Sequence, residues 1–305
     1  MLETNLAGVK LQNPTVLASG IRGVTGASLV HMAKEGAGAV TTKSISLNER
    51  KGHPNPVIVT YDQGMINAVG LSNPGAKDAV PELEYAVKNA GVPVIASIFA
   101  STITEFGKVA EAVSQANPDI IEVNISCPNV EDEFGRPFAC DPGISTVVMK
   151  KIKKVTSIPA FAKLTPNVHR IGEIAKAVEK GGADGITAIN TVGPGMLINI
   201  EAATPVLSNK VGGISGPAIK PIAVKCIYDI HKATKLPIIG TGGATTGRDA
   251  VEMIMAGASA VGIGSGVYYR GSGVFRAVAK EIQEFMDAEG YKSIEEMRGI
   301  AHENQ

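Results

Sequence analysis

Apolar, β-branched runs recur along the chain, and each is introduced by one of two local signals. In five cases a proline stands at or just before the run, where no hydrogen-bond donor to a neighbouring strand is yet needed. In three cases the run follows Gly-Ala, and the glycine can end the preceding helix in a left-handed conformation. The runs begin near Pro14, Gly36, Pro93, Pro118, Pro159, Gly182, Pro237 and Gly257. The pattern therefore predicts eight buried strands.

Amphipathic helical patterns lie between these strands, for example at residues 174–180 and 250–255. Continuous apolar strands that alternate with helices indicate a parallel sheet covered by helices. Eight such units in a chain of 305 residues predict an α/β fold of the (β/α)8 TIM-barrel type. A doubly wound open sheet is the alternative, but that fold does not normally need eight units of this regularity.

Shorter elements are expected at the two ends of the barrel. Residues 2–12 have the pattern of a hairpin that would close the barrel bottom, and residues 275–286 are predicted to form the last barrel helix. A short closing helix should begin with a capping box made by Ser293 and Glu296. No shift in composition marks a domain boundary, so we expect one domain over residues 1–305.

Composition and charge exclude several classes of partner. Lys+Arg and Asp+Glu both total 29, so bulk charge gives no reason to expect a nucleic acid or a membrane surface as partner. No apolar run approaches the ~20 residues that span a bilayer. The three cysteines form no C-x-x-C pair and the five histidines lack ligand spacing. We therefore expect a cytoplasmic protein with no disulfide framework, metal site or iron–sulfur cluster of its own.

Chemistry is expected where the strands end, because a barrel of this type builds its active site at the carboxyl ends of its strands. The residues at these ends, in chain order, are Ser19, Lys43, Ser97, Asn124, Lys163, Asn190, Gly242-Gly243 and Gly264-Ser265. Each asparagine alone is typical of a turn, and each lysine alone is typical of a solvated strand end. Two lysines and two asparagines at one mouth favour a binding site.

The glycine-rich ends of the last two strands predict a phosphate site. Barrels commonly hold a phosphate on backbone N–H groups after strands seven and eight. The longest intervals between strand ends follow strands two, four and six, and such insertions can build a lid over the mouth. A phosphate-bearing cofactor would then face a second compartment that is lined by amides.

The sequence Asn-Ile-Ser-Cys-Pro-Asn at residues 124–129 is the most unusual of these strand exits. It places a thiol between two carboxamides immediately after an apolar strand. The carboxamides can donate and accept hydrogen bonds to a planar heterocycle, and a cysteine can transfer a proton. An ordinary strand-to-loop exit explains any one of these residues, but it explains the whole set poorly.

Six segments together resemble the dihydroorotate dehydrogenases, and they occur in the family's order along almost the whole chain. The segments are Thr-Thr-Lys-Ser-Ile at 41–45, Asn-Ala-Val-Gly-Leu-Ser-Asn-Pro-Gly at 67–75, Asn-Ile-Ser-Cys-Pro-Asn at 124–129, Ala-Ile-Asn-Thr at 188–191, Gly-Gly-Ile-Ser-Gly-Pro-Ala at 212–218 and Ile-Gly-Thr-Gly-Gly at 239–243. This family is an FMN-binding (β/α)8 barrel that oxidises dihydroorotate to orotate in pyrimidine biosynthesis.

The resemblance implies a role for each matching position. Cys127 would be the catalytic base, as the cysteine is in soluble class 1 enzymes, whereas class 2 enzymes have serine. The implied FMN contacts are Ser19, Lys43, Ser44, Asn124, Lys163, Ile189, Gly216, Gly242, Gly243, Gly264 and Ser265. The implied substrate contacts are Lys43, Asn67, Ala68, Val69, Gly70, Leu71, Asn124, Asn129, Asn190 and Thr191.

The ending of the loop, Phe-Ala-Cys-Asp-Pro at 138–142, resembles the NAD-linked class 1B pattern. That class implies a homodimeric core, joined by a subunit that carries FAD and [2Fe–2S] into a heterotetramer of two dimers. Two positions depart from the family. Ser97 stands where asparagine is usual, and Cys140 replaces a hydroxyl residue, which brings a second thiol that could pair with Cys127 on oxidation.

Other functions stay open from the residues alone. They include a fumarate-linked class 1A homodimer and a related FMN barrel that acts on another pyrimidine, such as uracil. A Schiff-base aldolase that uses Lys163 and a non-catalytic barrel that binds a phosphorylated metabolite are further alternatives. RNA dihydrouridine reduction is disfavoured, because the chain has no net charge and no added basic domain.

Overall fold

The computed structural model describes residues 1–126 and 138–303. Eight parallel strands form a closed barrel in the order β10-β15-β16-β3-β4-β7-β8-β9. The strands are β3 (Thr15–Leu17), β4 (Ala39–Thr41), β7 (Val94–Ile98), β8 (Ile120–Asn124), β9 (Ala160–Leu164), β10 (Gly185–Ala188), β15 (Ile238–Thr241) and β16 (Ala260–Ile263). The eight predicted strands and the predicted barrel are confirmed.

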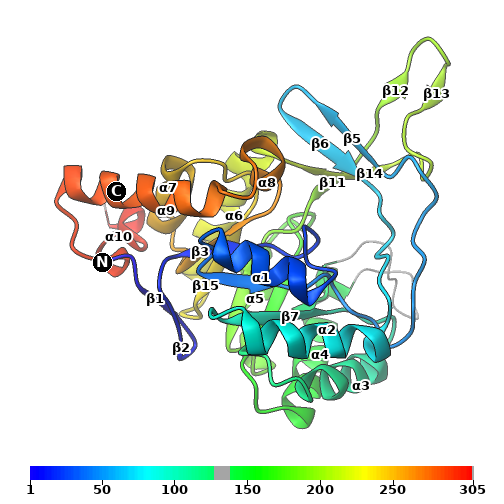
Figure 1. Cartoon of the computed structure of the whole chain (residues 1–305), viewed down its shortest axis with the longest axis horizontal. Coiled ribbons are helices and arrows are strands. Elements are labelled where there is room, and N and C mark those ends of the chain that lie inside the picture. The colour runs from blue at the N-terminus through cyan, green and yellow to red at the C-terminus, as the bar shows by residue number, and fades with distance from the viewer. Residues whose placement is uncertain (127–137, 304–305) are drawn as a thin grey trace.

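Helices cover the outside of the barrel (Figure 1). Seven helices each follow a barrel strand, and α8 and α9 both follow β16. They are α1 (Gly26–Lys34), α2 (Ala76–Asn89), α3 (Ile103–Ser114), α4 (Pro142–Val155), α5 (Ile171–Lys180), α6 (Lys220–Ala233), α7 (Gly247–Met255), α8 (Gly266–Arg270) and α9 (Val274–Glu289). Their apolar faces pack on the strands in one large cluster of buried residues. No helix in the described part of the chain is both long enough and apolar enough to cross a membrane.

An N-terminal hairpin closes the bottom of the barrel, as the sequence predicts. It consists of β1 (Thr4–Leu6) and β2 (Val9–Leu11), which pair antiparallel. Leu6 and Leu11 are fully buried against Ile95, Ile120 and Phe161 at the amino ends of the barrel strands. Burying a leucine in this way stabilises the fold by about 1.5–3 kcal/mol. The hairpin therefore seals the end of the barrel opposite the predicted site.

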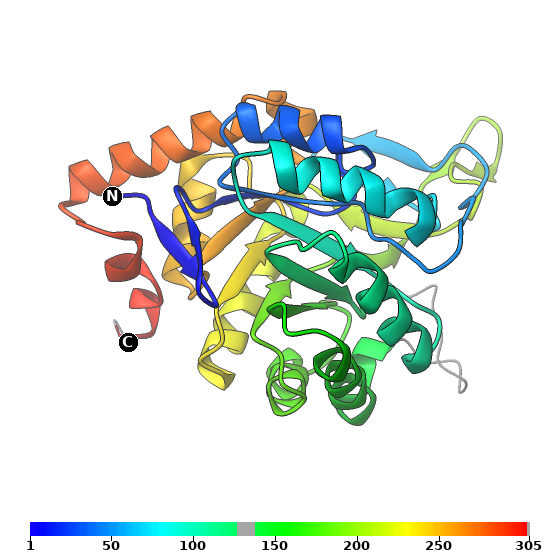
Figure 2. The ribbon, with the colours of Figure 1, turned by 60° about the horizontal axis from the view of Figure 1, so that its bottom comes forward.

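The insertions after the second and sixth barrel strands pair with each other above the mouth. They form an antiparallel sheet in the order β11-β14-β6-β5. Its strands are β5 (Ile58–Tyr61), β6 (Gly64–Asn67), β11 (Val192–Gly195) and β14 (Gly212–Ser215), and a hairpin of β12 (Ile198–Asn199) and β13 (Thr204–Pro205) extends beyond it. This sheet and the N-terminal hairpin lie at opposite ends of the molecule (Figure 2).

The C-terminal segment differs from its prediction at one hydrogen bond. Helix α10 (Ile294–Met297) begins after Ser293, whose hydroxyl accepts from the Glu296 N–H, as in a capping box. The Glu296 carboxylate, however, accepts from the N–H of Lys292 instead of that of Ser293. The predicted box is therefore only half formed. Helix α7 has the complete reciprocal box, made by Thr246 and Asp249.

Candidate active site

A cavity of about 250 Å³ lies at the mouth of the barrel, beneath the antiparallel sheet. Nearly all the site residues predicted from sequence line it. From the substrate set these are Lys43, Asn67, Ala68, Val69, Gly70, Leu71, Asn124, Asn190 and Thr191. From the cofactor set they are Ser19, Lys43, Ser44, Asn124, Lys163, Ile189, Gly242, Gly243, Gly264 and Ser265. Residues far apart in the sequence are thus brought into one pocket.

Among the predicted site residues that the structure describes, only Gly216 does not line the cavity. Cys127 and Asn129 lie outside the described residues. The carbonyl oxygen of Gly216 lies 2.6 Å from the position that a Cβ on the lining residue Gly243 would occupy. The neighbouring Ser215 lines the cavity in its place.

Several lining residues were not among the predicted site residues, although Gly213 and Thr241 lie within two of the motifs at 212–218 and 239–243. They include Ile21, Ile58, Met65, Gly213, Ile219 and Thr241. Ile58 and Met65 come from the hairpin of β5 and β6, which covers the cavity only because β6 pairs with β14. This pairing joins segments that are about half the chain apart, and local periodicity does not reveal it.

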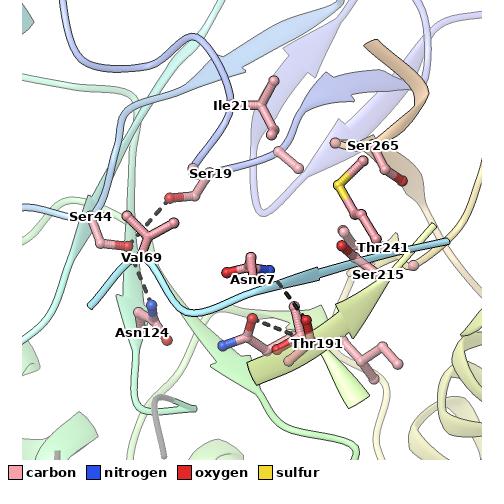
Figure 3. Close-up of a pocket in the computed structure, with 18 of the residues that line it drawn as sticks. Ser19, Ile21, Ser44, Asn67, Val69, Asn124, Thr191, Ser215, Thr241 and Ser265 are labelled. Atoms are coloured by element: carbon pink, nitrogen blue, oxygen red, sulfur yellow. Dashed lines mark hydrogen bonds between the residues drawn. The ribbon is translucent and has the colours of Figure 1, made fainter. Parts of the chain in front are cut away.

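One side of the cavity carries a set of linked hydroxyl and amide groups (Figure 3). The hydroxyl of Ser19 donates to the carbonyl of Thr42 at 2.8 Å and lies 3.3 Å from the hydroxyl of Ser44. The Asn124 side-chain amide donates to Ser44 at 3.3 Å. Ser44 and Asn124 are both buried, so this side of the pocket is held in one arrangement.

Ser126 connects two of the lining asparagines. Its hydroxyl donates to Asn124 Oδ1 at 2.7 Å and accepts from Asn190 Nδ2 at 2.7 Å. Asn190 Oδ1 in turn accepts from the Thr191 N–H at 2.9 Å. These bonds fix which way each carboxamide points. Ser126 lies within the 124–129 motif, but the sequence alone predicts no role for it.

Lys163 lines the cavity floor above a buried carboxylate. Its Nζ atom lies 3.7 Å from Glu122 Oε1, and both side chains are more than nine-tenths buried. Glu122 also accepts from the Ser97 hydroxyl at 3.0 Å. Within the described residues, the buried hydroxyls of Thr187 and Thr241 have no hydrogen-bond partner, and Thr241 lines the cavity. The cavity floor is therefore polar and has unused bonding capacity.

The loops after β15 and β16 contribute the glycine-rich end of the cavity. Gly242 and Gly243 have φ values of +139° and +80°, which L-residues with side chains rarely adopt. A Cβ on Gly264 would make only ordinary van der Waals contact, with Ala18 and Ile21 at 3.6 and 3.8 Å, so no close neighbour crowds this residue. Backbone N–H groups can therefore approach a ligand closely here.

The start of α7 is not available for an anion. Its first turn is occupied by the Asp249 carboxylate, which accepts from the N–H groups of Thr245 and Thr246. Lys220 pairs with Asp249 at 2.9 Å. Burial raises the pKa of Asp249, but these hydrogen bonds outweigh it and lower the pKa to about 2. The loops that contain Gly243 and Gly264 are therefore the remaining candidate position for a phosphate.

The loop at 67–71 is held by three hydrogen bonds to neighbouring segments. Asn67 Nδ2 donates to the Gly213 carbonyl at 3.4 Å, which ties the loop to β14. Arg50 Nε donates to the Gly70 carbonyl at 2.9 Å, and the buried Asn73 amide donates to the Leu71 carbonyl at 2.9 Å. The loop thus reaches the pocket in a fixed conformation.

Comparisons with known proteins agree with this geometry. A family model described as dihydroorotate dehydrogenase matches residues 1–286. The chain is 50% identical over 299 residues to the dihydroorotate dehydrogenase B (NAD(+)) catalytic subunit of Methanosarcina mazei, with 98% of this chain and 94% of the relative covered. The proteins of the same description from Methanocaldococcus jannaschii and Pyrococcus abyssi are 49% and 46% identical, each with 99% of both chains covered. The chain belongs to the dihydroorotate dehydrogenase family.

Proposed function

We propose that this chain oxidises dihydroorotate to orotate and passes the electrons through a partner subunit to NAD⁺. The observation that carries the proposal is the two-part cavity. Its glycine-rich end suits a phosphate, and its other end presents Lys43, Asn67, Asn124 and Asn190. The description of the relatives as catalytic subunits of an NAD(+) enzyme supports the acceptor and the need for a partner.

The residues present fit FMN. The uncrowded backbone at Gly264 and the positive-φ backbone at Gly242 and Gly243 suit its phosphate. Ser19, Ser44 and Asn124 offer hydrogen bonds to the ring edge, and Ile189 and Ser265 complete the wall. When bound, FMN supplies a two-electron acceptor for the hydride from C6 of dihydroorotate. Lys163 would offset the negative charge that reduction brings to the pyrimidine edge of the ring.

The substrate end suits a carboxylated pyrimidine. Lys43 would attract the carboxylate of dihydroorotate, and the carboxamides of Asn67, Asn124 and Asn190 match the donors and acceptors of its ring. Asn129 would add a further amide. A cation for the carboxylate favours dihydroorotate over uracil or thymine, which lack that group.

Cys127 is the proposed base that removes the proton from C5. It follows Ser126 directly in the chain, and Ser126 bonds to both Asn124 and Asn190 at the cavity. A cysteine in this role acts as its thiolate, which nearby cations favour. The proton then resides on the sulfur, and the C5–C6 bond of the product becomes double.

The electrons must pass from the reduced flavin to NAD⁺ through another protein, because the sequence shows no dinucleotide fingerprint and no cysteine pattern for an iron–sulfur cluster. We infer a partner subunit that carries FAD and [2Fe–2S] and binds a homodimer of this chain, giving a heterotetramer of two dimers. This proposal excludes fumarate as the electron acceptor.

The test begins with the purified chain reconstituted with FMN. Anaerobic mixing with dihydroorotate should bleach the flavin absorbance, whereas dihydrouracil should leave it unchanged. NAD⁺ reduction should require co-expression with the partner, and fumarate should not reoxidise the flavin. Bleaching by dihydrouracil alone, or rapid reoxidation by fumarate, would overturn the assignment.

A further inference from the structure

Glu122 is a buried acid to which the proposed reaction gives no role. Along β8, alternate residues point into the barrel, so Ile120, Glu122 and Asn124 form a ladder from bottom to mouth. Ile120 belongs to the apolar plug, and Asn124 lines the cavity. Glu122 lies between them, only 2 % exposed and not part of the cavity wall.

The carboxylate of Glu122 has two polar partners inside the barrel. Lys163, 6 % exposed, places Nζ 3.7 Å from Glu122 Oε1, and the Ser97 hydroxyl donates to the same oxygen at 3.0 Å. An unpaired buried carboxylate would be strongly unfavourable, so the positive charge of Lys163 compensates it. Because Lys163 also lines the cavity, the pair connects the interior of the barrel to the ligand.

The hydrogen bonds around Ser97 have a fixed direction. Since the Ser97 proton goes to Glu122, the Ser44 hydroxyl, 2.9 Å away, must donate to Ser97. The Ser19 proton is similarly used by the Thr42 carbonyl. With both protons used, Ser19 and Ser44 can act toward a ligand only as hydrogen-bond acceptors, and Ser44 already accepts from the Asn124 amide. The Ser44 hydroxyl thus donates to Ser97, and Ser97 donates to the Glu122 carboxylate, where this series of hydrogen bonds ends.

We propose that Glu122 is a positioning residue that holds Lys163 at the cavity and sets the reduction equilibrium of the flavin that would bind there. The proposal rests on the proposed function. Glu122 and Lys163 together bring no net charge to the floor of the site. The carboxylate therefore limits how strongly Lys163 stabilises the added negative charge of the reduced ring. Without the carboxylate, the floor has one uncompensated positive charge and the flavin becomes easier to reduce.

The experiment compares the wild type with Glu122→Gln, which keeps the shape and the acceptor oxygen but removes the charge. The midpoint of flavin reduction is measured against a reference dye, and the FMN dissociation constant by titration of the apoprotein. We expect Glu122→Gln to shift the two-electron equilibrium toward the reduced form about tenfold, which corresponds to ~30 mV. Asp229→Asn, which breaks an exposed pair with Lys225 on α6, is the matched control and should shift nothing.

A double-mutant cycle tests whether Glu122 acts through Lys163. The double variant Lys163→Gln/Glu122→Gln leaves no lone buried ion, so it guards against a Glu122→Gln chain that does not fold. Lys163→Gln alone leaves the buried Glu122 carboxyl without its cation, and burial then favours the neutral, protonated form of that carboxyl. The proposal expects the effect of Glu122→Gln to vanish in this background. An unchanged equilibrium in the single variant, or an equal shift in both backgrounds, would overturn it.

Ser97→Ala tests the linked hydroxyls separately from the charge of Glu122, because it removes the Ser97 hydroxyl and keeps the carboxylate. It should weaken FMN binding about two- to tenfold, since Ser44 loses its acceptor, and shift the reduction equilibrium much less than Glu122→Gln does. A wild-type chain that binds no FMN, or whose flavin dihydroorotate does not reduce, refutes the proposed function instead. If the wild-type chain binds FMN and dihydroorotate reduces that flavin, the outcomes of the variants alone decide the role of Glu122.

Discussion

At the scale of single residues, the cavity depends on side chains whose hydrogen bonds fix their orientation. A carboxamide presents a donor on one side and an acceptor on the other, so a rotated asparagine would offer a ligand the wrong group. Ser126 prevents this for Asn124 and Asn190, because its one hydroxyl bonds to both. A residue that touches no ligand can in this way control substrate recognition.

Ser126→Ala should therefore weaken substrate binding. Loss of a hydrogen bond to each asparagine should raise the KM for dihydroorotate about two- to tenfold, with a smaller effect on kcat. Steady-state kinetics with the reconstituted enzyme measures this. Ser114→Ala is the matched control, since Ser114 also bridges two groups, the Ala110 carbonyl and Thr156, but lies on α3. Equal KM values for both variants would contradict the role of Ser126.

The catalytic prediction at this scale concerns Cys127. Cys127→Ala should slow flavin reduction by dihydroorotate about 10²–10⁴-fold, the usual contribution of a general base, while FMN stays bound. Cys127→Ser should also be slow but should recover at high pH. Stopped-flow absorbance at several pH values separates the two variants.

Cys140→Ser is the control for Cys127. Cys140 is exposed in the short helix at Phe138–Cys140, and partial burial of its thiol raises its pKa. It is therefore a poor source of thiolate near neutral pH, and its loss should leave the rate of flavin reduction unchanged. Wild-type speed in Cys127→Ala would remove Cys127 from the mechanism.

At the scale of secondary-structure elements, two glycines at the carboxyl end of β16 should respond differently to an added methyl group. On Gly264 a Cβ would make ordinary contact with Ala18, so the apoprotein should keep its stability. The methyl group would, however, fill the space proposed for the phosphate. Gly264→Ala should weaken FMN binding about 10–100-fold, as expected for lost hydrogen bonds to a charged group.

Gly262→Ala should instead destabilise the apoprotein, and it serves as the comparison. Its Cβ would collide with the Thr241 hydroxyl inside the barrel. Overpacking of this kind typically costs about 1–3 kcal/mol, so the apoprotein itself should be destabilised. Denaturant unfolding of both apoproteins, together with FMN titration, measures the difference. Equal stability losses would show that Gly264 matters for folding instead of binding.

The elements also show what the sequence can and cannot predict. The barrel strands follow from local signals, because Pro14 or Gly257 marks the start of a run and each strand is buried on both faces. The sheet above the mouth pairs β6 with β14, whose short strands carry no regular alternation, so their pairing depends on tertiary structure. Glu122 was missed for a related reason, since one acid within an apolar run does not reveal its partners.

At the scale of the whole molecule, the first residues and the last described ones, up to residue 303, are held at the amino-terminal end of the barrel, away from the cavity. The N-terminal amine donates to the Lys292 carbonyl at 3.0 Å. The C-terminal turn contributes His302, whose ring stacks on Tyr228 of α6 with centroids 3.7 Å apart. The ring of His231 lies 4.7 Å from that of His302 and fills the space beside Gly257. Protonation here should therefore affect how the C-terminal segment packs.

The free energy of unfolding should depend on pH through His231. Burial, together with the nearby charges of His302, Arg298 and Lys235, lowers the pKa of His231, although Glu295 opposes this. A lowered folded pKa means that the unfolded chain binds the proton more readily. The contribution of His231 is therefore fully present above its ordinary pKa near 6.5, and it is lost as pH falls from there toward the folded pKa.

Denaturant unfolding at pH 7.5 and 5.5 should show a lower free energy of unfolding at the acidic pH. His231→Gln should reduce that difference, because glutamine does not titrate. The acids with lowered pKa values, Asp249 and Glu281, titrate below this window and cannot produce the change between these two pH values. His31→Gln, on α1 and away from the C-terminal segment, is the control and should keep the wild-type pH dependence. If His231→Gln also keeps the wild-type pH dependence, the packing of the C-terminal segment does not depend on protonation of His231.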